Sequence, residues 1–203
     1  MNLTLEQIDA LQEIINIGVG QAAGVLNEML CSHITLQIPF IKTFSPDLVK
    51  EELELKLGKG KFSAVELEFF GSVSGNAELV FPTDSAAELV SIVTDEETEV
   101  SESEMDELKV GALTEIGNIV ISGVMGAISN ILSQDLEYFL PSYIEGNIDT
   151  LIEHQKLEKH STLVLAQTRF FIEETNIQGD IILIFHLGSF HKISEMLEGL
   201  DGG

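Results

Sequence analysis

Cysteine and basic residues are scarce in this chain of 203 residues. Its one cysteine, Cys31, excludes a disulfide within the chain and fits a reducing compartment. There are 10 lysines and arginines against 34 aspartates and glutamates, which gives a formal net charge of −24. Because proteins bind nucleic acids and anionic membranes through cationic side chains, both are poor candidates as partners. A protein with a basic patch, or one that carries its own metal ion, fits this charge better.

Targeting segments and metal-ligand patterns are also absent from the sequence. The opening MNLTLEQIDALQEI has no basic segment followed by an apolar run, so no secretory signal is visible. The longest run without charge, residues 116–134, is long enough to span a membrane, but it contains Asn, Ser and Gln and has no basic flank. The five histidines show no paired helical spacing for metal ligands. We therefore expect a cytoplasmic protein with no membrane insertion and no metal site, in which Cys31 is a small packed residue.

The sequence repeats itself at a distance of about 100 residues. A shift of 102 positions aligns two polar residues and a proline of each half: Glu13 with Glu115, Asn16 with Asn118, and Pro39 with Pro141. A shift of 104 aligns GNAELVF (75–81) with GDIILIF (179–185). A period of this length is too long for a solenoid unit and indicates a duplicated half-domain. We expect one domain, 1–203, made of half-repeats at about 1–94 and 105–200 and joined by an acidic connector.

Two long helices are the most regular elements that the sequence predicts. In the first, apolar residues recur every three or four positions from Leu5 to Met29, and Thr4 with Gln7 forms a capping-box pattern at its start. The second is expected from Ser103 or Glu104 to about residue 133. Both are rich in Gly and Ala in their middle parts, and small residues there favour close approach by another backbone.

Extended segments and short helices fill the remainder of each half. The predicted strands are 34–41, 61–70 and 76–81 in the first half, and 136–144, 161–173 and 179–187 in the second. Short amphipathic helices are predicted at 85–93 and 189–197. This order favours the α/β (α+β) class: a single domain with pseudo-two-fold internal duplication, in which two long helices pack on a largely antiparallel sheet.

A line of polar side chains follows one face of the first helix: Asp9, Glu13 and Asn16. Alone, this line is the ordinary solvated face of an amphipathic helix. The Glu/Asn pair recurs in register in the second helix, however, whereas its neighbour Gln12 is matched by Thr114. A pair that repeats while its neighbours diverge favours a functional role.

The arrangement Asp9-x3-Glu13-x2-Asn16-x22-Pro39, repeated as Glu115-x2-Asn118-x22-Pro141, resembles the motif of the CheC family of chemotaxis phosphatases, which groups CheC, CheX and FliY. The similarity covers essentially the whole chain. Two motifs in one chain resemble CheC more than CheX, whose members typically carry one. One position departs from the pattern: Gly111 stands where the second motif should have Asp or Ser. The resemblance thus implies that the first motif, which begins with Asp9, forms a stronger site than the second, which has Gly111 at that position.

The resemblance implies a phosphatase that hydrolyses the aspartyl phosphate of the response regulator CheY. Asn16 and Asn118 are then the water-orienting groups, because a carboxamide can accept a hydrogen bond from water and donate one to a phosphoryl oxygen. The resemblance also assigns roles to the other motif residues: Glu13 and Glu115 pair with a lysine of the regulator, and Asp9, Pro39 and Pro141 support the motif or the docking. No cofactor is implied on this chain, and Mg²⁺ is expected on the phosphorylated CheY-like partner.

Two other functions are compatible with the same residues. The chain could be a non-catalytic adaptor that binds phosphorylated CheY or a CheD-type receptor deamidase, for which an acidic surface suits a basic patch. It could also be a purely structural duplicated domain whose Glu/Asn pairs solvate or cap helices. A dinucleotide site is a poor reading of Gly18 and Gly20, because their GxG lies within a predicted helix and not in a strand-to-helix loop.

Overall fold

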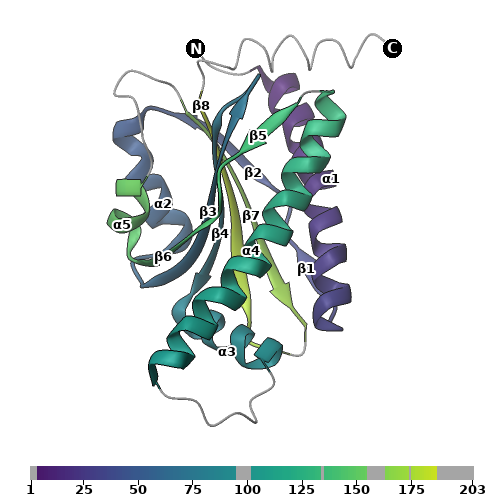
Figure 1. Ribbon diagram of the computed structural model, residues 1–203. Helices are drawn as coiled ribbons and strands as arrows, with labels where there is room; N and C mark the ends of the chain where they lie inside the picture. Colours follow the sequence, from purple (N-terminus) through teal and green to yellow (C-terminus); the bar gives the residue numbers. More distant parts are fainter. Residues whose placement is uncertain (1–3, 95–101, 134, 155–162, 174, 187–203) are drawn as a thin grey trace.

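A single antiparallel sheet lies between two layers of helices in the computed structural model, which describes residues 4–94, 102–133, 135–154, 163–173 and 175–186 (Figure 1). The helices in these ranges are α1 (Leu5–Leu30), α2 (Val49–Leu57), α3 (Thr83–Thr94), α4 (Glu102–Leu132) and α5 (Ile148–His154), with a 3-10 turn at Pro46–Leu48. The strands are β1 (Ile34–Leu36), β2 (Phe40–Phe44), β3 (Phe62–Gly71), β4 (Gly75–Pro82), β5 (Leu136–Tyr138), β6 (Ser142–Gly146), β7 (Leu163–Ile172) and β8 (Gln178–His186).

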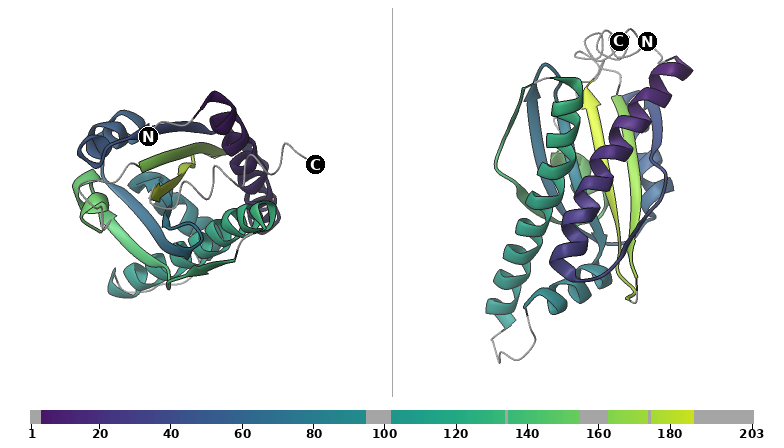
Figure 2. Two further views of the ribbon diagram at one scale, coloured as in Figure 1. Left: turned by 90° about the horizontal axis from the view of Figure 1, so that it is seen from above. Right: turned by 90° about the vertical axis from the view of Figure 1, so that its right-hand side faces the viewer.

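The strand order is β1-β7-β8-β4-β3-β5, with β2 also paired to β7 and β6 also paired to β3. All of these pairs are antiparallel. Helices α1 and α4 lie side by side on one face of the sheet, while α2 and α5 lie on the other (Figures 1 and 2). The predicted class, two long helices on an antiparallel sheet, is confirmed.

The starts of both long helices lie close to their predicted positions. The Thr4 hydroxyl accepts a hydrogen bond from the Gln7 backbone N–H at 3.2 Å, and the Gln7 side chain accepts one from the Thr4 N–H at 3.0 Å. This reciprocal capping box starts α1 as predicted. Helix α4 begins at Glu102, one or two residues before its predicted start, so the last residues of the predicted acidic connector are helical. The rest of that connector, residues 95–101, and the predicted short helix at 189–197 lie outside the described residues.

The extended segments differ from the prediction in one respect. Each predicted single strand, 34–41 and 136–144, is two short strands, and Pro39 and Pro141 lie in the breaks between them. Proline has no N–H to give to a strand ladder, so pairing stops before each proline and resumes after it.

The two helices that follow these segments, α2 and α5, were not predicted. Their short stretches offered too few helical turns for a recognisable apolar period.

The strand register repeats between the halves. At one edge Ile34 pairs with Ile172, and at the other edge Leu136, its equivalent at a shift of 102, pairs with Gly71. At the centre Glu78 pairs with Ile182, the residue 104 positions later. The pseudo-two-fold axis therefore passes between β4 and β8. The exact limits of the half-repeats stay a prediction.

Close packing against neighbouring elements explains some of the small residues in the two long helices. A Cβ added at Gly18 would lie 2.9 Å from the carbonyl oxygen of Val124, and one added at Gly117 would overlap the side chain of Val65 in β3. Helix α4 is long and apolar enough to cross a membrane by length and composition. Its apolar residues, however, line the main core between the helices and the sheet.

Cys31 differs from its prediction as a packed residue, since it is exposed. It ends α1 in the left-handed conformation, with φ of 50°. Its structural role is therefore to end the helix and not to fill the core.

Candidate functional site

The polar line of α1 lies directly opposite the buried face of the helix. Asp9, Glu13 and Asn16 are all exposed, while Leu11 and Ile15 between them are 1% exposed. The shared direction of the three side chains follows from the helical repeat, because residues three or four positions apart lie on the same face of a helix. The carboxylate and the carboxamide therefore face solvent and do not pack in the core.

Glycines continue this face beyond Asn16. Gly20 and Gly24 are exposed, and nothing lies within 4 Å of a Cβ built on either. Neither glycine is needed for packing within this chain, in contrast to the buried Gly18. The lack of a side chain at these two positions lets the surface of a large partner approach the helix closely.

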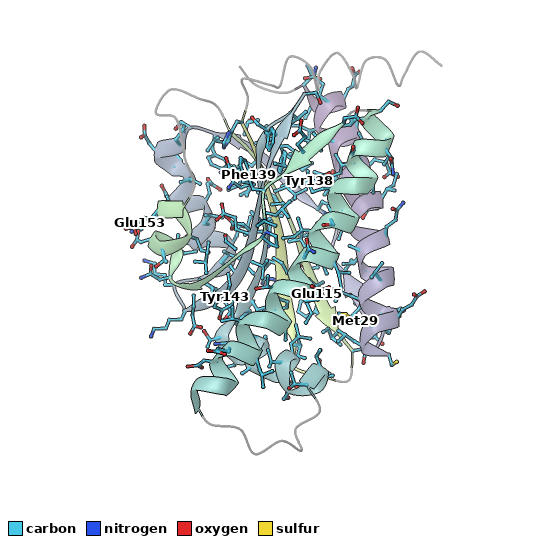
Figure 3. The ribbon with its side chains drawn as sticks, in the orientation of Figure 1. Met29, Glu115, Tyr138, Phe139, Tyr143 and Glu153 are labelled. Carbon is cyan, nitrogen blue, oxygen red and sulfur yellow. The ribbon has the colours of Figure 1, made fainter. Side chains whose placement is uncertain are left out.

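The corresponding face of α4 carries Glu115, which is labelled in Figure 3 and is exposed. It also carries Asn118, which is half-buried. One turn further on, the hydroxyl of Ser122 donates a hydrogen bond to Oδ1 of Asn118 at 3.3 Å. Ser122 stands where α1 has Gly20, so the second carboxamide has a neighbour that holds its oxygen and the first has none at that position. At the start of this line Gly111 is exposed and contributes no side chain.

The proline of the first motif lies against the helix turn that carries Glu13. Pro39 is buried, and its carbonyl oxygen accepts a hydrogen bond from Nε2 of Gln12 at 2.7 Å. Gln12 is the residue immediately before Glu13. This contact ties the break between β1 and β2 to the site. Sequence reasoning singled out Pro39 but did not identify Gln12 as its partner.

The second motif is tied to its helix by a different contact. Nζ of Lys109 on α4 lies 2.9 Å from Oε2 of Glu145 on β6, four residues beyond Pro141. The Tyr143 hydroxyl donates to the same carboxylate oxygen at 2.7 Å. These hydrogen bonds from Lys109 and Tyr143 lower the pKa of Glu145. Partial burial opposes the change at Lys109, but the bond to Glu145 raises the pKa of that ammonium, so both groups are charged at neutral pH.

The two Glu/Asn pairs form two separate sites. Helices α1 and α4 run in opposite directions (Figure 1), and Gly18 of α1 lies against Val124 of α4. Asn118, six residues before Val124, therefore lies level with about Gly24. Eight residues of helix separate that level from Asn16, a distance of about 12 Å along the axis at 1.5 Å per residue. One bound partner atom cannot contact both carboxamides, so the two pairs are two separate candidate sites.

The chemistry available at each site is that of a carboxylate and a carboxamide on an accessible helix face. Among the residues that the structure describes, no three His, Cys, Asp or Glu side chains gather closely enough to hold a metal ion. A carboxylate can accept charge-assisted hydrogen bonds from a partner's lysine or arginine, and a carboxamide can both donate and accept. Such a pair can dock a cationic group and orient a water, but it supplies no strong nucleophile.

The chain is similar in sequence and in fold to several known proteins. No family model matches the sequence. The chain is 23% identical over 199 residues to the CheY-P phosphatase CheC of Bacillus subtilis (strain 168), covering 93% of this chain and 92% of that protein. Its fold is similar to that of Thermotoga maritima FliY, with a TM-score of 0.75 and 21% identity over 98% of this chain and 99% of that one.

A third relative was solved in a complex with CheY. The fold is similar to that in the CheX-CheY-BeF3-Mg²⁺ complex of Borrelia burgdorferi, with a TM-score of 0.55 and 20% identity. The match covers 85% of this chain and 96% of that chain. At these identities the solved structures establish the fold, and the assignment of an activity depends on the site.

Proposed function

We propose that this chain, which belongs to the CheC, CheX and FliY family, is a phosphatase that hydrolyses the aspartyl phosphate of a CheY-type response regulator. The observation that carries the proposal is the Glu/Asn pair on the outward face of a helix, which occurs at equivalent places on two helices packed side by side. A structural role alone does not require two polar residues to repeat in register while neighbouring surface residues diverge.

In the proposed reaction each carboxamide places a water molecule for attack. Oδ1 of Asn16 or Asn118 accepts a hydrogen bond from the water, and Nδ2 donates one to a phosphoryl oxygen. The water oxygen attacks phosphorus, and the bond between phosphorus and the aspartyl oxygen breaks, which releases the regulator's carboxylate and inorganic phosphate. Positioning and charge stabilisation suffice for such a transfer, so no covalent intermediate on this chain is needed.

The glutamates fix the register of the docked regulator. Glu13 and Glu115 lie one helical turn before their asparagines and are exposed, so each can form an ion pair with a lysine beside the regulator's phosphoaspartate. Mg²⁺ would be bound by the regulator, where it neutralises the phosphoryl oxygens, and this chain would contribute no ligand to it. Because the regulator is a cytoplasmic signalling protein, the proposal also assigns this chain to the cytoplasm.

The test is phosphate release from the phosphorylated CheY-type regulator of the same organism. Asn16→Ala and Asn118→Ala should each remove one site and leave the other working. The double variant should lose about 100-fold or more of the stimulated rate, which is the usual effect of removing a group that stabilises the transition state. Asn27→Ala is the matched control, because Asn27 is an exposed asparagine on α1 outside the motif. A double variant with the wild-type rate would overturn the mechanism.

An adaptor role is the second candidate, and the net charge of −24 favours it. An acidic surface attracts a basic patch on a partner, such as phosphorylated CheY's lysine region or a CheD-type deamidase, and this attraction weakens with salt. If binding is the main function, affinity for the partner should survive the Asn16→Ala, Asn118→Ala double change and fall as salt is added. Phosphate release by the wild type that depends on both asparagines would instead assign catalysis.

A further inference from the structure

Two aliphatic side chains stand in solvent immediately before the two motif prolines. Ile38 is 80% exposed and Leu140 is 91% exposed. They are equivalent under the shift of 102 positions that relates the two Glu/Asn pairs. A single exposed aliphatic residue needs no explanation in a protein. The same exposure at the same place beside both motifs does.

Ile38 is held in a defined place next to the first site. It lies in the break between β1 and β2, and the residue after it, Pro39, is buried with its carbonyl bonded to Gln12. Gln12 precedes Glu13 on α1. The backbone that carries Ile38 is therefore anchored to the turn of α1 that presents the Glu13 carboxylate, and the Ile38 side chain is directed away from the core.

Leu140 occupies the equivalent place at the other edge of the sheet. It lies in the break between β5 and β6, and β6 is anchored to the start of α4 by the ion pair of Lys109 with Glu145. The pairs β1/β2 and β5/β6 are at opposite edges of the sheet, and the right-hand view of Figure 2 shows both edges beside the two long helices. Each Glu/Asn pair therefore has one exposed aliphatic side chain of its own.

We propose that Ile38 and Leu140 are apolar docking contacts that hold the response regulator engaged by the adjacent Glu/Asn pair. The inference rests on the proposed function and names a further part of the same site. The occupant is the regulator because the contact is continuous with the Glu/Asn face through the bond between Gln12 and Pro39.

The charge of the chain supplies a physical reason for such a contact. A phosphorylated regulator presents an anionic phosphoryl group to a chain of net charge −24. A lysine that pairs with Glu13 or Glu115 offsets only part of the repulsion, because exposed ion pairs contribute little in salt. Apolar contact is independent of charge, and interfaces commonly surround a buried apolar anchor with a polar rim. Ile38 and Leu140 would be those anchors.

The test uses proteins with one working site. Ile38→Ser is placed in the Asn118→Ala background, where only the first site remains, and Leu140→Ser is placed in the Asn16→Ala background. Each change should raise KM about tenfold and leave kcat within about twofold, because it removes binding that is equal in the ground and transition states. The dissociation constant for the beryllofluoride-activated regulator should rise by about the same factor. Leu55→Ser is the matched control, since Leu55 is 76% exposed on α2, on the opposite face of the sheet.

The outcomes separate this inference from the function on which it rests. If the background proteins hydrolyse the regulator and neither serine change moves KM or the dissociation constant beyond the Leu55→Ser control, the docking role is overturned and the phosphatase survives. If the wild type binds the activated regulator without hydrolysing it, the dissociation constants alone decide the docking role. A wild type that neither hydrolyses nor binds overturns both. Unchanged thermal unfolding of the serine variants shows that a loss of binding is not a loss of folding.

Discussion

Single side chains distinguish the two sites of this molecule. One turn before Glu13 the first site has the exposed carboxylate of Asp9, while the second has Gly111. One turn after the asparagine the first site has Gly20, while the second has Ser122, whose hydroxyl bonds to Asn118. The first site therefore has more negative charge and a freer carboxamide. The second has less charge and a carboxamide whose oxygen is already oriented.

The missing carboxylate can be restored without repacking. Gly111 is exposed and has nothing within 4 Å of a built Cβ, so Gly111→Asp fits on α4. In the Asn16→Ala background we expect kcat/KM for the phosphorylated regulator to rise about two- to fivefold, which corresponds to one exposed charge interaction. The reverse change, Asp9→Gly in the Asn118→Ala background, should lower it by a similar factor. If both changes leave kcat/KM as it was, the first motif position has no part in docking.

At the scale of elements, two long helices are brought together by residues that have little or no side chain. Gly18 of α1 meets the backbone of Val124, Ala22 meets Gly123, and Gly117 of α4 meets Val65 of β3. These close approaches bury the apolar side of each helix and thereby leave the motif faces outward. The geometry of the sites thus depends on packing that happens on the other side of the same helices.

Replacement of glycine by alanine should change the stability of the protein in opposite directions on the two sides of the long helices. Gly117→Ala would force its Cβ into the Val65 side chain on a buried strand, and overpacking of this kind costs about 1–3 kcal/mol of stability. Gly24→Ala has open space in a helix interior and should stabilise by about 0.5–1 kcal/mol, because alanine loses less conformational entropy on folding. Denaturant unfolding followed by circular dichroism measures both. Equal effects of the same sign would contradict the packing described for α4.

At the scale of the whole molecule, each half of the chain completes the sheet of the other. The edge strands β1 and β2 of the first half pair with β7, and the edge strands β5 and β6 of the second half pair with β3. Helices α1 and α4, one from each half, share the main core. Among the described strands, only β3 with β4 and β7 with β8 pair within a single half. Neither half alone can therefore pair its edge strands or bury its apolar helix face.

A chain cut at the junction should reveal this dependence. Residues 1–94 expressed alone lack β7 and β8, which pair with β1, β2 and β4, and they lack the α4 partner of α1. We expect this fragment not to give a cooperative unfolding transition and to aggregate, because its unpaired strand edges and apolar helix face are exposed. Heat denaturation and size-exclusion chromatography, with the 203-residue protein as the control, measure both properties. A monomeric fragment with a cooperative transition would show that the half-repeats are independent domains.

Local signals in the sequence determined much of this protein. The helical period and the capping box of Thr4 and Gln7 set the start of α1 within the chain itself, because these are contacts between residues three or four apart. The repeat at 102 positions singled out Glu13, Asn16 and their counterparts without any structure. It also contained a signal that went unused, since Ile38 and Leu140 align under the same shift.

Contacts between distant residues were decided by the tertiary structure alone. A repeat in the sequence does not say which strand of one half pairs with which strand of the other, so the crossing of β2 to β7 and of β6 to β3 could not be predicted. Burial of Pro39, its bond to Gln12 and the exposure of Ile38 depend on that crossing. The sequence by itself determined which residues could form the sites, because their spacing along a helix is local. The tertiary structure determined that these residues form two separate sites on one side of the sheet. Only packing determines how two helices 102 residues apart contact each other.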